Sequence, residues 1–154
     1  MNITFADEQD DPLEPGPLVD LAERVLQGEH LPDTTEVAIT LVDADRIAWL
    51  NHEHLGKVGP TDVLSFPLEQ LEPGVTPFAH PGGPPVALGD VVICPHVVRG
   101  RAHAAAVDFE DEMALMVVHG LLHLLGYDHV KDEDAEQMEA RERDLLATVG
   151  RIRP

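Results

Sequence analysis

The segment Met113–Leu125 places the strongest constraint on the fold, because every residue in it is apolar except His119, Gly120 and His123. A helix that is hydrophobic on all sides is buried inside a domain, so we expect this helix to be central. Two histidines within it need partners, because burying an unpaired imidazole carries a desolvation penalty. The segment is shorter than the ~18 apolar residues that a membrane-spanning helix needs, and we predict no membrane association.

His119, His123 and His129 are spaced to meet at one point. Residues four apart project from one face of a helix, and Gly126 tolerates the positive φ that ends a helix and turns the chain. Such a turn returns His129 to the same place. Three neutral imidazoles with a fourth position open to water form a catalytic zinc site. We therefore predict that these three histidines bind one Zn²⁺ ion per chain.

The remaining segments predict an α+β fold. Period-two alternation indicates strands, and apolar residues three or four apart indicate helices. We expect strands at 2–5, 36–42, 62–66 and 89–94, and helices at 18–26, 43–54, 96–106, 109–125 and 132–149. An acidic connector is expected at 7–17 and a long loop at 67–88, which holds six prolines and three glycines. We predict one metal-dependent hydrolase domain over residues 1–154. It should have about four strands in a mixed sheet and a mainly helical C-terminal half, and its N-terminus (1–17) should consist largely of the acidic connector.

The chain is strongly acidic, with 10 Lys plus Arg against 29 Asp plus Glu and a net charge of −19. Such a charge repels nucleic acid at long range, because phosphate binding normally uses clustered Lys and Arg. Cys94 is the single cysteine, which excludes an intramolecular disulfide. The N-terminal segment carries several acidic residues and no apolar stretch of a secretory signal, so we expect a cytoplasmic protein.

The histidine helix is zincin-like, and its spacing is that of the metzincin peptidases. Those enzymes need a Glu beside the first histidine as general base. Here that position is Gly120, which has no proton-accepting side chain. A peptidase of that mechanism is therefore disfavoured.

Three segments resemble blocks of one known family. The segment from His119 to His129 is similar to the signature of the YbeY family of bacterial rRNA-maturation endoribonucleases, and 60–67 and 88–94 match two further blocks. The resemblance covers about 36–146. It implies a zinc-dependent, single-strand-specific endoribonuclease that acts in late 16S rRNA 3′-end maturation and ribosome quality control, with the three histidines as ligands. It also implies single-stranded rRNA and the small ribosomal subunit or its proteins as partners.

One departure from the family pattern concerns phosphate binding. Many members have an Arg where this chain has Leu55, and an Asp where it has Val58. One hypothesis is that Lys57 takes part of the phosphate role, as a point charge and not as a bidentate fork, although a solvated loop lysine also explains this residue. Asp128 is expected to orient a histidine ligand through a hydrogen bond behind the metal, although turn formation alone also explains an aspartate there.

Three functions remain open from the sequence. The first is the RNA endonuclease, with either a metal-activated water or the RNA 2′-OH as nucleophile. The second is a zinc hydrolase of another substrate class. The third is a non-catalytic, zinc-stabilised protein associated with the ribosome, which the acidic surface favours because ribosomal proteins are basic.

Overall fold

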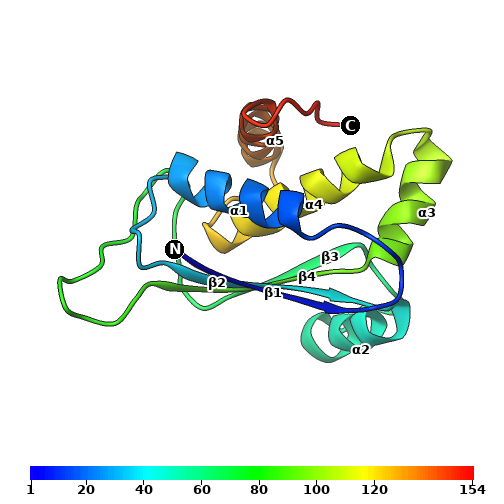
Figure 1. Cartoon of the computed structure of the whole chain (residues 1–154), viewed down its shortest axis with the longest axis horizontal. Coiled ribbons are helices and arrows are strands. Elements are labelled where there is room, and N and C mark those ends of the chain that lie inside the picture. The colour runs from blue at the N-terminus through cyan, green and yellow to red at the C-terminus, as the bar shows by residue number, and fades with distance from the viewer.

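A four-stranded mixed sheet separates the helices into layers (Figure 1). The computed structural model describes residues 1–154, and its strands are β1 (Asn2–Glu8), β2 (Glu36–Val42), β3 (Val63–Pro67) and β4 (Ala87–Ile93). The strand order is β1-β2-β4-β3; β2 runs parallel to β1 and β4, whereas β3 is antiparallel to β4. The α+β prediction is confirmed, and β3 lies at one edge.

The helices are α1 (Gly16–Gly28), α2 (Ala44–Leu55), α3 (Pro95–Ala105), α4 (Phe109–Leu124) and α5 (Asp132–Ala147). In Figure 1, α1 and α4 cover one face of the sheet and α2 lies on the other, while α5 forms an outer layer over α1 and α4. None of the helices combines the length and the apolar composition that crossing a bilayer requires.

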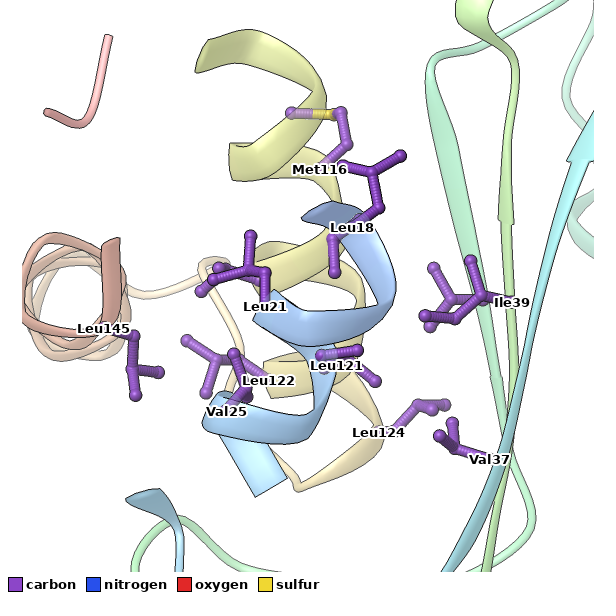
Figure 2. Close-up of a cluster of buried hydrophobic side chains, with 14 of the residues drawn as sticks. Leu18, Leu21, Val25, Val37, Ile39, Met116, Leu121, Leu122, Leu124 and Leu145 are labelled. Atoms are coloured by element: carbon purple, nitrogen blue, oxygen red, sulfur yellow. The ribbon is translucent and has the colours of Figure 1, made fainter. Parts of the chain in front are cut away.

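Helix α4 lies at the centre of the main core, as its uniformly apolar sequence predicts. Leu121, Leu122 and Leu124 are all fully buried. In Figure 2 their side chains lie among residues of α1, β2 and α5, including Val25 of α1 and Leu145 of α5. Burying one such leucine contributes about 1.5–3 kcal/mol. Packing on several sides gives the histidines of α4 a rigid base.

Helix α4 approaches the sheet very closely at Gly120. A Cβ at this position would lie 2.5 Å from Cγ1 of Val91 on β4. The hydroxyl of Ser65 on β3 donates to the Gly120 carbonyl at 2.9 Å. Residue 120 therefore faces the sheet and has no room for a side chain. The glycine that weakens the peptidase interpretation is thus a packing requirement.

The predicted boundaries differ from the structure mainly at the N-terminus. β1 extends to Glu8, so the connector predicted at 7–17 begins only at residue 9 and ends where α1 begins. The backbones of Asp7 and Glu8 pair with β2, while an edge strand allows charged side chains to face water. No helix or strand lies between Pro67 and Ala87, but the loop is shorter than the predicted 67–88, because Pro67 ends β3 and β4 already begins at Ala87. Helix α5 ends two residues before the predicted Val149.

Candidate metal centre

The structure brings the three predicted histidines together. The Nε2 atoms of His119 and His123 are 3.1 Å apart, and one ring nitrogen from each of His119, His123 and His129 lies within 4.8 Å of the others. Two nitrogen ligands of one zinc ion, each at about 2.0–2.1 Å, are roughly 3.3–3.4 Å apart at a tetrahedral angle. The spacing of the first two rings is therefore close to what one ion requires.

A tight turn after α4 positions the third histidine. Gly126 has φ +98°, and the Tyr127 N–H donates to the Leu122 carbonyl at 3.0 Å, which closes the end of the helix. A Cβ on Gly126 would lie only 2.1 Å from the carbonyl oxygen of Leu71 in the long loop. The turn therefore needs glycine for its backbone angle and for this close approach, and it carries His129 back toward the helix.

Hydrogen bonds from behind orient the two helical rings. The Nδ1 atom of His123 is 2.9 Å from the Tyr127 carbonyl oxygen, which can only accept, so Nδ1 carries the proton. The Nδ1 atom of His119 lies 3.1 Å from Oε2 of Glu142 and donates to that carboxylate. Both Nε2 atoms then present a lone pair toward each other and toward His129. Partners of this kind fix ring orientation and raise the basicity of metal ligands.

Glu142 is a site residue that our sequence analysis missed. It lies on α5 and is 1% exposed, and its second oxygen is 3.5 Å from Nε of Arg153, which supplies the opposite charge. A signal was present in the sequence, because Glu142 takes one position of the apolar stripe formed by Met138, Leu145 and Leu146. An acidic residue on a buried stripe indicates a specific partner, since an unpaired buried charge is very costly.

The pKa of His123 is lowered. Burial is the largest cause of this shift. The neighbouring His119 and His129 lower the pKa further, because a positive charge on His123 is unfavourable beside other imidazoles that can carry one. His123 is therefore neutral near pH 7, which is the form that binds a metal.

The histidines open into a cleft of about 610 Å³ that β3 and α2 also line. Lys57 and Leu55 both line it, and Leu55 is 52% exposed. Asp128 is exposed, and its Oδ1 accepts from the backbone N–H of His129 at 2.7 Å. Asp128 thus contacts the turn, whereas the imidazoles of His123 and His119 donate to Tyr127 and Glu142.

The donor set fits a divalent transition metal. It offers three imidazoles, two of them held with Nε2 free, and neutral nitrogen ligands of this number and kind suit zinc. Without a cation, two lone pairs 3.1 Å apart would repel each other unless a proton lay between them. The histidine cluster is therefore able to bind a metal ion.

The contact between Glu142 and His119 leads to a testable prediction. We expect Glu142→Gln to weaken metal binding by about 10- to 100-fold, the usual effect of losing an outer partner of a ligand. Metal affinity is measured by competition with a chromogenic chelator.

A matched control is Glu139→Gln on the same helix. Glu139 lies 3.9 Å from Arg153 and touches no histidine, so we expect its affinity to stay within about twofold of the wild type. Equal affinities for the two variants would contradict the role of Glu142.

Comparisons with known proteins agree with the site. The family model described as Endoribonuclease YbeY matches residues 4–150. The chain is 40% identical over 146 residues to the endoribonuclease YbeY of Nocardia farcinica, covering 95% of this chain and 79% of that protein. It is 39% identical over 155 residues to that of Renibacterium salmoninarum, covering 100% and 97%. A solution structure of a Thermotoga maritima protein matches with TM-score 0.61 and 28% identity, covering 96% of this chain and 91% of that one.

Proposed function

The chain belongs to the YbeY endoribonuclease family, and on this premise we propose that it is a zinc-dependent endoribonuclease specific for single-stranded RNA. We further propose that it acts in late maturation of the 16S rRNA 3′ end and in ribosome quality control, in the cytoplasm, as one hydrolase domain of residues 1–154. The small ribosomal subunit or its proteins are the proposed partners. The observation that carries the proposal is the convergence of three imidazoles in an open cleft.

His119, His123 and His129 are the proposed ligands of the ion. A bound zinc ion supplies Lewis acidity, which lowers the pKa of water and polarises a phosphoryl oxygen. The ligands are uncharged, so the full double charge of the ion is available to the phosphate. Glu142 and the Tyr127 carbonyl hold the rings in position, and Asp128 supports the turn that carries His129.

The substrate class is tested by comparing single-stranded RNA with a casein-like peptide, each with and without a chelator. We expect RNA cleavage that disappears on chelation, returns when zinc is added, and is absent from His119→Ala. Peptide cleavage that depends on metal would instead indicate a hydrolase of another class. A folded, metal-loaded protein that cleaves neither substrate would reject the proposed function.

Lys57 is the proposed phosphate contact. It is the only Lys or Arg among the residues that line the cleft, and a single ammonium acts as a point charge. We expect Lys57→Ala to weaken RNA binding by about two- to tenfold, and to make the slope of log affinity against log salt shallower by about 0.7.

The control for Lys57 is Arg24→Ala, an exposed cation of α1 outside the cleft. RNA titrations at several salt concentrations measure the RNA affinity of each variant and the slope of log affinity against log salt. An unchanged affinity and slope for Lys57→Ala would remove Lys57 from the site.

A further inference from the structure

The free edge of β3 lies beside the histidine cluster. β3 is the last strand of the sheet and pairs with β4 alone. Its residues Val63, Leu64, Ser65 and Pro67 line the same cleft as the histidines. Backbone groups that no strand pairs are therefore available inside the candidate catalytic cleft.

The register of the ladder identifies these free groups. The Asp62 carbonyl accepts a hydrogen bond from the Cys94 N–H, so even-numbered positions of this segment face β4. Hydrogen-bonded and non-hydrogen-bonded positions alternate along an antiparallel pair. Val63, Ser65 and Pro67 therefore turn their backbone groups away from β4, toward the free edge.

Ser65 alone offers a complete donor and acceptor pair at this edge. The Val63 N–H is already bound by Oδ1 of Asp62 at 2.8 Å, and Pro67 has no N–H. The Ser65 hydroxyl donates to the Gly120 carbonyl and is occupied. The Ser65 N–H and C=O remain, and the two groups of one residue point the same way, as they do when a neighbouring strand binds both.

The Watson–Crick edge of every base also carries an acceptor next to a donor. In a duplex these groups are used by the opposite base, whereas in single-stranded RNA proteins bind them directly. We propose that the Ser65 N–H and C=O bind the Watson–Crick edge of an unpaired nucleotide, an inference that rests on the proposed ribonuclease function. Because all four bases offer such a pair, this contact selects for unpaired RNA without selecting a sequence.

The charge of the molecule supports recognition through bases. The net charge is −19, and half of the ten Lys and Arg residues already form ion pairs with carboxylates: Arg99, Arg101, Arg141, Arg151 and Arg153. Lys57 is the only one that lines the cleft. Phosphate contacts are therefore few, and neutral backbone groups hold a base without any need for surface charge. We expect the slope of log affinity against log salt to be no steeper than about −2, since each phosphate contact contributes about −0.7 on a single strand.

The test compares three cleavage-resistant oligouridylates with 2′-O-methyl sugars and phosphorothioate linkages. The first carries unmodified uracil bases. The second carries N3-methyluracil, whose methyl group blocks the Watson–Crick edge, and the third carries 5-methyluracil, whose methyl group lies away from that edge. Binding to the zinc-loaded chain is measured by fluorescence anisotropy. We expect N3-methylation to weaken binding about tenfold or more, because two hydrogen bonds are lost, and 5-methylation to change it less than about twofold.

A protein variant tests the same contact from the other side. Ser65→Pro removes the N–H at an edge position, where proline is tolerated. It also removes the hydroxyl that donates to the Gly120 carbonyl, so Ser65→Ala, which loses the hydroxyl and keeps the N–H, is the matched control. We expect weaker binding of the unmodified oligomer and a smaller further loss on N3-methylation than in the wild type, because the carbonyl of residue 65 can still accept from the uracil N3–H, with metal affinity unchanged as evidence of folding. If this variant does not fold, the comparison of the methylated oligomers decides alone.

The outcomes separate this inference from the proposed function. Equal binding of the N3-methyl and 5-methyl oligomers, or a salt slope of about −4 or steeper, overturns the role of the β3 edge and leaves the ribonuclease proposal standing. No binding of any oligomer, together with no cleavage of RNA, overturns both.

Discussion

His123→Ala is expected to abolish metal loading and RNA cleavage together. The substitution removes one of the three proposed ligands, so the loss of metal affinity should exceed the ~100-fold upper range for outer partners. It also leaves the Tyr127 carbonyl without its donor, which costs about 1 kcal/mol in the metal-free protein. Metal content after dialysis and the rate of RNA cleavage are the measurements.

The matched control is His103→Ala, which removes an exposed imidazole from α3, outside the cluster. This variant should keep its metal and its activity. A His123→Ala protein that still holds one ion and cleaves RNA at the normal rate would falsify the three-histidine centre. Denaturant unfolding in the presence of chelator distinguishes loss of the ligand from general unfolding.

Gly126→Ala is expected to cause a large loss of stability through a single added methyl group. A non-glycine residue at φ +98° is strained by about 1–3 kcal/mol. The new Cβ would also lie 2.1 Å from the backbone oxygen of Leu71, and overpacking of this kind costs about another 1–3 kcal/mol. We expect the free energy of unfolding, measured with denaturant, to fall by about 3–5 kcal/mol. Metal binding should also weaken, because the turn carries His129.

Gly150→Ala separates the two causes. Gly150 also has a positive φ, +74°, but no atom lies within 4 Å of a Cβ placed there. This control should lose only about 1 kcal/mol, the cost of the left-handed backbone alone. Equal losses for the two variants would show that the contact with Leu71 has no energetic role.

The elements nearest the site could be predicted from the sequence because their signals are local. The apolar run of α4, the i and i+4 histidines and the glycine after the helix are all read within one short segment. The cap of α2 is equally local, because Oδ1 of Asp43 accepts from the Arg46 N–H at 2.8 Å. Local patterns of this kind depend little on the rest of the chain.

What could not be predicted depends on contacts distant in sequence. Glu142 lies 23 residues after His119, and only the docking of α5 on α4 brings the two together. The position of β3 at the sheet edge results from the strand order, which alternation alone does not encode. Periodicity shows which face of a strand is buried but not which neighbour it pairs with.

The contact between α5 and His119 also concerns the time at which the protein becomes active. The three histidines precede α5 in the chain, so they are synthesised before Glu142. We expect a nascent chain without α5 to hold metal poorly. Tight metal binding would then follow the completion of α5, and an incomplete chain would not cleave the ribosomal RNA next to it.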